Sequence, residues 1–148
     1  MTQPPRPSQR PGPTSRQTGA DGVALSEDDA RRIVEEGDAE RLVTMAAELG
    51  PRLGVNLTQL RRFFGEVKRI EMLWSPPGAE DRARRRAILL EPRLSYQVQR
   101  QTQVRALRNV LQPCLKFAAK DRDRFQRFVE FYEALIAYAP RTTQGGRE

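Results

Sequence analysis

The sequence predicts an all-α fold, a compact bundle of five to six short helices with a disordered N-terminal arm. Three observations lead to this prediction. Apolar residues recur at helical spacing, no stretch alternates with period two for long enough to form a strand, and no internal repeat of about 20 to 50 residues is visible. At 148 residues the chain is long enough for one domain that buries its own core without metals or disulfides.

The division of the chain is predicted from its composition. Residues 1–22 are rich in Pro, Gly, Ser, Thr and Gln and contain almost no apolar anchor, so ordering them would cost conformational entropy that nothing offsets. We therefore expect a disordered arm at residues 1–22, a helical bundle at residues 23–139 and a disordered tail at residues 140–148. The absence of a signal peptide and of a run of about 18 apolar residues predicts a soluble, cytoplasmic protein without a membrane partner.

Two short helices are expected directly after the arm. Ser26, with Asp29 three residues on, resembles a capping box with a shorter acid and predicts a helix from about residue 26 to residue 36. Gly37 fits a left-handed cap at its end, and Asp38 caps a second helix that ends near Gly50. Residues 26–57 carry four basic and eight acidic groups, so we expect no phosphate contact there.

The run Thr58–Trp74 is the clearest helical signal, and we expect the rest of the bundle to be organised around it. One side of its helical wheel is apolar and carries Leu60, Phe63, Phe64, Val67, Ile70 and Trp74. The opposite side carries Arg61, Arg62, Lys68 and Arg69, with Gly65 in the middle of the basic arc. Ala would stabilise an exposed helix by ~1 kcal/mol at that position, so a partner that comes close is one explanation for the glycine. The alternative for the whole arc is that charged side chains only solvate the outside of a packed helix.

A Ser-Pro-Pro-Gly loop at residues 75–78 ends this helix. Glu80 and Asp81 then suit the start of another helix. The arginines from Arg82 to Arg86 surround most of its circumference and cannot all face a core. They form either a solvated linker helix or a second set of phosphate contacts.

Two longer helices are expected in the rest of the chain. Pro92 is well placed as the first residue of a helix that continues to Asn109. The inner side of that helix is marked by Leu94, Val98 and Leu107. Pro113 is expected to interrupt or kink the chain. The last helix, Asp121–Ala139, carries half of the aromatic residues and is expected to be a central packing element.

The basic charge is concentrated in the centre of the chain. Residues 58–120 carry 14 basic and five acidic groups, whereas the whole chain has a net charge of +7. Most of these cations are arginines, whose planar guanidinium groups suit bidentate phosphate contacts and stacking on bases. An anionic polymer is therefore the natural partner.

Side chains suited to catalysis are scarce. There is no histidine, and the single cysteine, Cys114, lies among apolar residues as a small core residue would. Three glutamates are the nearest acids to the basic centre, but they share no clear face and are explained by pairing on helix surfaces. These are Glu66, Glu71 and Glu80. We expect no enzymatic activity, metal or cofactor, and a carboxylate-based helical enzyme is the least favoured alternative.

Three segments in this order carry a family resemblance. They are residues 57–64 (LTQLRRFF), residues 90–100 (LEPRLSYQVQR) and residues 125–138 (FQRFVEFYEALIAY). Together they resemble the small subunit of the type III-A (Csm-type) CRISPR–Cas effector complex, over roughly residues 27–139. The resemblance implies an all-helical, non-catalytic subunit that stacks in several copies along guide RNA and target RNA. It also implies a large subunit and backbone subunits as partners, with target cleavage assigned to the backbone subunit.

The resemblance and the charge distribution together predict an RNA-binding site. The resemblance assigns nucleic-acid contacts to Gln59, Arg61, Arg62, Arg93 and Arg100. The charge distribution adds Lys68, Arg69, Arg82, Arg85 and Arg105. The alternative function is a helical DNA-binding protein that uses the Thr58–Trp74 helix to read a duplex through Gln59 and the arginines beside it.

Contacts with neighbouring subunits are expected where apolar side chains leave the main apolar arcs. Three residues meet this description, namely Met72, Leu73 and Phe131.

Overall fold

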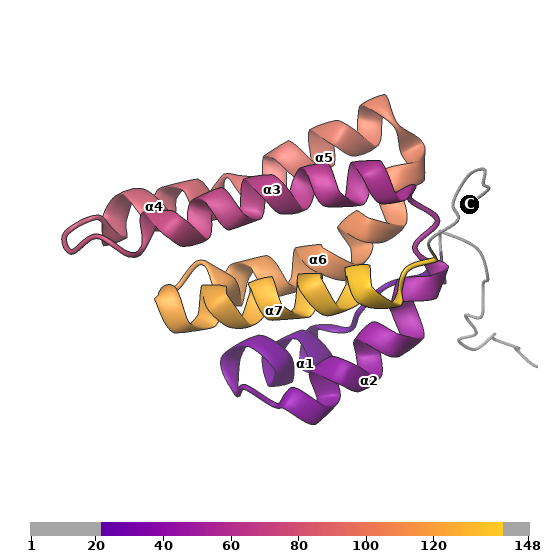
Figure 1. The fold of residues 1–148 in the computed structure, drawn as a ribbon, viewed down its shortest axis with the longest axis horizontal. Helices are drawn as coiled ribbons and strands as arrows, with labels where there is room; N and C mark the ends of the chain where they lie inside the picture. Colours follow the sequence, from indigo (N-terminus) through magenta and orange to yellow (C-terminus); the bar gives the residue numbers. More distant parts are fainter. Residues whose placement is uncertain (1–21, 141–148) are drawn as a thin grey trace, which may run out of the picture.

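The computed structural model describes residues 22–140 as an all-α protein (Figure 1). No strand occurs in this range, and the predicted fold class is confirmed. The predicted N-terminal arm and C-terminal tail lie outside the described residues, apart from Gly22 and Pro140 at the borders.

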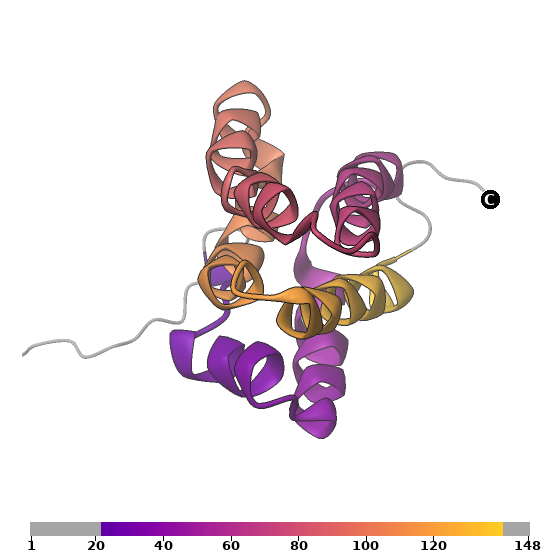
Figure 2. The same cartoon turned by 90° about the vertical axis from the view of Figure 1, so that its left-hand side faces the viewer.

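The helices form three layers. In chain order they are α1 (Glu27–Ala30), which continues into a π-helical turn at Arg31–Glu35, α2 (Ala39–Leu49), α3 (Leu57–Leu73), α4 (Glu80–Ile88), α5 (Leu90–Arg100), α6 (Arg105–Ala118) and α7 (Arg122–Tyr138). Short 3-10 turns at Gly50–Arg52 and Thr102–Val104 precede α3 and α6. Helices α6 and α7 lie between an outer layer of α1 and α2 and an outer layer of α3, α4 and α5, and the end-on view in Figure 2 shows the same order. We call the α1–α2 layer the acidic layer and the α3–α5 layer the basic layer.

Helix α7 forms the centre of the core, as its aromatic content predicts. Its fully buried side chains include Phe125, Phe128 and Tyr132. The Tyr132 hydroxyl donates a hydrogen bond to the Leu60 carbonyl of α3 at 2.8 Å, which satisfies the one polar atom that this ring buries. Burial raises the pKa of Tyr132 far above its usual value because the phenolate would be desolvated. At the other end of α3, Trp74 packs on Phe125 with ring centroids 5.0 Å apart.

The predicted signals at the ends of the N-terminal helices are confirmed. The Ser26 hydroxyl accepts a hydrogen bond from the Asp29 backbone N–H at 3.0 Å, and Asp38 caps α2 in the same way. Gly37 has a φ of 71°, the left-handed conformation expected for a residue that ends a helix. The start of α3 differs from the prediction, because Asn56 caps it and Thr58 lies inside the first turn. Asn is as good a capping residue as Thr, and helical periodicity does not choose between them.

The prediction of one helix from Pro92 to Asn109 is wrong. Helix α5 starts at Leu90 and ends at Arg100, Gln101 is extended, and α6 starts at Arg105. Val98 and Leu107 are nine residues apart, which places them about half a turn away from each other on a straight helix. Both side chains are buried, so the chain has to break between them. Pro92 is the third residue of α5, where its missing N–H has no partner to lose.

Of the two outcomes predicted for Pro113, an interruption or a kink, the interruption is wrong. Pro113 lies inside α6, which continues to Ala118. A proline there removes the hydrogen bond to the carbonyl four residues earlier, which belongs to Asn109. That carbonyl accepts the Leu25 backbone N–H at 3.4 Å instead. The proline therefore frees an acceptor that attaches the segment before α1 to the middle layer.

The candidates for contacts with neighbouring subunits have different surroundings. Phe131 is completely buried in the core, so its assignment to a neighbouring subunit is wrong. Its position on the helical wheel is off the main arc, but α7 is covered on several sides and buries a wider arc than one stripe. Leu73 is half-buried against the core. Met72 is 67% exposed, and its contact with a neighbour stays a prediction.

Candidate nucleic-acid interface

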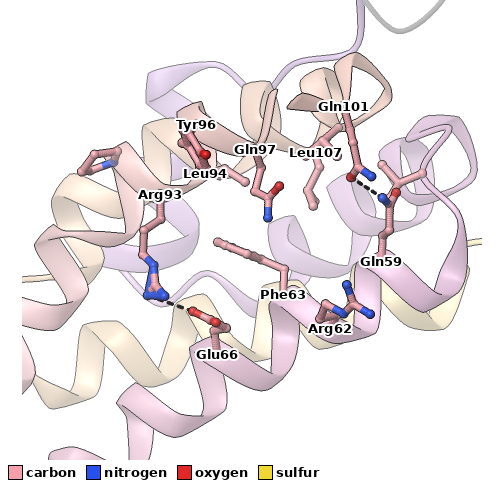
Figure 3. Close-up of a pocket in the computed structure, with 13 residues that line it drawn as sticks. Gln59, Arg62, Phe63, Glu66, Arg93, Leu94, Tyr96, Gln97, Gln101 and Leu107 are labelled. Atoms are coloured by element: carbon pink, nitrogen blue, oxygen red, sulfur yellow. Dashed lines mark hydrogen bonds and ion pairs between the residues drawn. The ribbon is translucent and has the colours of Figure 1, made fainter. Parts of the chain in front are cut away.

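A groove runs between α3 and the α4–α5 segment. A cavity of about 520 Å³ separates the first half of α3 from α5 (Figure 3). A second cavity of about 570 Å³ continues toward α4, and both are lined by Glu66, Pro92 and Arg93. The two cavities adjoin at these residues on the basic layer, and we call them together the α3–α5 groove.

Cations enter this groove from both sides. Arg62 and Arg69 come from α3, where a spacing of seven residues places them on the same edge of the helix. Arg86 and Arg93 come from the opposite wall, from α4 and α5. A strand of phosphates in the groove would lie between two rows of guanidinium groups.

Arg93 and Arg100 lie on the edge of α5 that carries Tyr96. Arg93 reaches across the groove and pairs with Glu66 of α3 at 3.0 Å, as Figure 3 shows. Arg100 donates a hydrogen bond to the Tyr96 hydroxyl at 3.2 Å and lies 5.7 Å from the centre of its ring. Tyr96 is exposed beside this cation, so the edge combines an aromatic surface with positive charge.

Gln59 joins the two walls at one end of the groove. Its side-chain amide donates to the Gln101 side chain, as Figure 3 shows. It also accepts a hydrogen bond from the Gln103 side chain at 3.1 Å. These hydrogen bonds connect the first turn of α3 to the break between α5 and α6. In this arrangement Gln59 links the two walls, and its role as an RNA contact stays a prediction.

A family model for Csm2 type III-A matches residues 36–144, which is most of the chain. The chain belongs to the Csm2 type III-A family. It is thus a small subunit of a type III-A CRISPR effector complex, and the resemblance described from the sequence is confirmed. No curated protein and no solved structure matches the chain.

The structure of this Csm2-family chain divides the predicted site residues of α3 between two edges. Arg62 and Arg69 line the groove, whereas Lys68 pairs with Glu71 at 2.8 Å on the other edge. The hydrogen bond to Glu71 raises the pKa of Lys68, against a lowering by desolvation, and Glu133 of α7 adds to the increase. Arg61 is seven residues before Lys68 and shares its edge.

The remaining predicted residues lie around the groove. Arg85 lines a shallow depression with Asp81, Arg84, Ile88 and Leu89, and of these residues Leu89 also lines the groove. Arg82 is exposed on α4, and Arg105 is half-buried as the first residue of α6. From the sequence, Arg86 could not be distinguished from the other arginines of the run Arg82–Arg86. The packing of α4 beside α3 shows that Arg86 lines the groove.

Carboxylates of the acidic layer pair with cations that lie outside the α3–α5 groove. Glu27 pairs with Lys116 of α6, and Glu35 pairs with Lys120 at 3.5 Å and with Arg124 at 3.4 Å. None of the ion pairs within residues 22–140 connects the acidic layer to an arginine of the groove. The groove cations are therefore not neutralised by the excess acid near the N-terminus.

Little in the described part of this Csm2-family chain suits bond-making chemistry. Residues 22–140 contain no group of three or more His, Cys, Asp or Glu side chains that would hold a metal. Cys114 is fully buried, and desolvation raises the pKa of its thiol far above the usual value. None of the helices in this range is long and apolar enough to cross a membrane.

Proposed function

We propose that this chain is a non-catalytic small subunit that binds the backbone of guide RNA or target RNA along α3 and the facing edge of α5. It also packs against the large subunit, the backbone subunits and further copies of itself. The observation that supports the RNA site is the α3–α5 groove, in which four arginines face one another and only Arg93 has an acidic partner within the described residues.

Binding through such a groove is expected to be independent of sequence. Guanidinium groups recognise phosphates, which every nucleotide carries, and base pairing with the guide already supplies the sequence information. The protein then needs to recognise only charge and the shape of the strand.

The proposal of a non-catalytic role rests on how the acids are used. Glu66 holds Arg93 and Glu71 holds Lys68, so each carboxylate already has a cation as its partner. The chain has no histidine to act as a general base at neutral pH.

The double variant Arg62→Ala/Arg69→Ala tests the proposed RNA site. In the reconstituted effector complex, we expect weaker binding of labelled target RNA, or a lower yield of guide-containing complex if the groove holds the guide. The slope of log affinity against log salt should fall by about 0.7 for each phosphate that the variant no longer neutralises. Arg31→Ala/Arg32→Ala is the matched control, because it removes the same two positive charges from the acidic layer, where Arg31 and Arg32 pair with Asp28.

Unchanged RNA affinity, assembly and salt dependence in the double variant would contradict the proposal. The alternative of a duplex reader is tested with the same protein, by competing unlabelled double-stranded DNA against labelled single-stranded RNA. Displacement of the RNA by duplex DNA at lower concentration than by RNA itself would favour the alternative.

A further inference from the structure

Gly65 lacks the structural reasons that account for the glycines at positions 37, 50, 54 and 78. Gly37, Gly54 and Gly78 have φ values of 71°, 70° and 85°, which side chains rarely adopt. At Gly50, a Cβ atom would come within 2.9 Å of the Leu135 carbonyl oxygen, so close packing against α7 excludes a side chain. Gly65 lies in the middle of α3 with ordinary helical backbone, and a Cβ atom there would meet nothing within 4 Å.

The glycine at this position carries a cost that no contact within residues 22–140 offsets. In the exposed interior of a helix, glycine destabilises the fold relative to alanine because it loses more backbone entropy on folding. No neighbouring atom of the described chain approaches Gly65, so the space beside it is open to a partner.

Four cations surround Gly65. They occupy the positions three and four residues before and after it, which are the nearest neighbours on a helix surface. They are Arg61, Arg62, Lys68 and Arg69, all exposed. Of these only Lys68 has an ion-pair partner within residues 22–140. The result is a patch of bare helix backbone with positive charge on both flanks.

We infer that this patch at Gly65 is the seat of the sugar-phosphate backbone of the bound RNA strand, an inference that rests on the proposed function. Without a side chain at its centre, a phosphate can approach the helix closely enough for cations on both flanks to reach it. Arg62 and Arg69 lie on the flank nearest the α3–α5 groove, so the same strand contacts the seat and the groove edge. The charge selects the occupant, because an RNA strand presents an anion at every nucleotide.

The inference predicts opposite effects on stability and on binding when a side chain is added at Gly65. Gly65→Gln places an uncharged, helix-favouring side chain in open space, so the melting temperature of the variant should equal or exceed that of the wild type. The same side chain holds the strand away from the helix. We expect target RNA binding by the reconstituted complex to weaken about tenfold, as for the removal of one charge-assisted hydrogen bond. Gly65→Ala should show a smaller decrease in affinity.

Ala47→Gln is the matched control, because it adds the same side chain to an exposed position of α2 in the acidic layer. It should leave RNA binding unchanged. Unchanged RNA binding in Gly65→Gln, together with weakened RNA binding in Arg62→Ala/Arg69→Ala, would contradict the inference about Gly65. It would leave the proposed function standing. Unchanged binding in both would overturn both.

A photocrosslinking experiment distinguishes RNA from a protein neighbour as the occupant of the patch at Gly65. RNA that contains 4-thiouridine, bound in the wild-type complex, should photocrosslink to the part of α3 around Gly65, and the crosslink should weaken in Gly65→Gln. If α3 crosslinks chemically to another subunit at this position while the RNA crosslink is absent, the seat belongs to a protein and the inference is wrong.

Discussion

In the acidic layer, carboxylates of α1 and its π-helical turn reach cations of the middle layer. In the basic layer, most arginines of α3 and α4 are exposed and have no ion-pair partner in another layer among residues 22–140. Glu27 and Glu35 each pair with residues more than 80 positions away, and these pairs attach the layer to α6 and α7. Arg62 and Arg69 line a groove instead. The comparison shows that charge in one layer serves the fold and in the other layer is available for binding.

Arginines also differ in whether they serve the fold, as a comparison of Arg127 in the middle layer with the groove arginines shows. Arg127 of α7 donates from one nitrogen to the carbonyl oxygens of Val34 and Glu35, both at 3.0 Å, and its guanidinium lies against Gly37. These carbonyls end the first helical segment and have no helical partner of their own to bind. Arg127 therefore acts as a helix cap supplied by another layer, a role that its side chain shares with none of the groove arginines.

The largest expected effect comes from a core substitution in the middle layer, which lies between the acidic layer and the basic layer. Phe125→Ala removes a fully buried ring that contacts Trp74 of α3, so the free energy of unfolding should fall by about 3–5 kcal/mol. Because both outer layers pack on α7, urea unfolding followed by Trp74 fluorescence and by far-UV circular dichroism should give coincident transitions. Tyr138→Ala, at an exposed position of the same helix, should change stability little. Separate transitions in the wild type would show that the layers fold independently.

A smaller effect is expected from the arginine that caps the acidic layer. Arg127→Ala leaves two partly buried carbonyls without their donor and should lower the free energy of unfolding by about 2 kcal/mol, while RNA binding stays unchanged. Arg69→Ala should show the reverse pattern, with weaker RNA binding and stability within about 0.5 kcal/mol of the wild type. Urea denaturation and RNA titration of both variants provide the test. Equal loss of stability in the two variants would remove the distinction between the layers.

The smallest expected effect concerns the one acid within the groove. The Glu66 and Arg93 side chains are 33% and 54% exposed, so their ion pair contributes about 0–1 kcal/mol and Glu66→Gln should scarcely change stability. The substitution frees Arg93 for phosphate and removes a repelling charge, so RNA affinity should rise about twofold to fivefold. Glu71→Gln frees Lys68 on the other edge of α3. Comparing the RNA affinities of the two variants shows whether a cation on the groove edge contributes more to binding than one on the other edge. Weaker RNA binding in Glu66→Gln would indicate that the ion pair holds the groove in its binding shape.

The sequence predicted the local features of the chain well and the connections between helices less well. The apolar stripe of α3 and the caps at Ser26, Gly37 and Asp38 were found because helical spacing and capping depend on residues close together in the chain. The break at Gln101 was missed, although the opposed positions of Val98 and Leu107 on a straight helix were a signal for it. The sequence left open whether Pro113 interrupts or kinks the chain, because the Leu25 N–H that takes up the freed Asn109 carbonyl comes from a distant segment.

The sequence by itself determined that this is a helical protein with a basic centre, since periodicity and charge are properties of the chain read locally. It also determined the family, through three segments that keep their order. Only the tertiary structure decided which cations are available, because an ion pair such as Glu27 with Lys116 joins residues far apart in the chain. Likewise, only the packing of α3 beside α4 and α5 made a groove of Arg62, Arg69, Arg86 and Arg93, and left the space above Gly65 open.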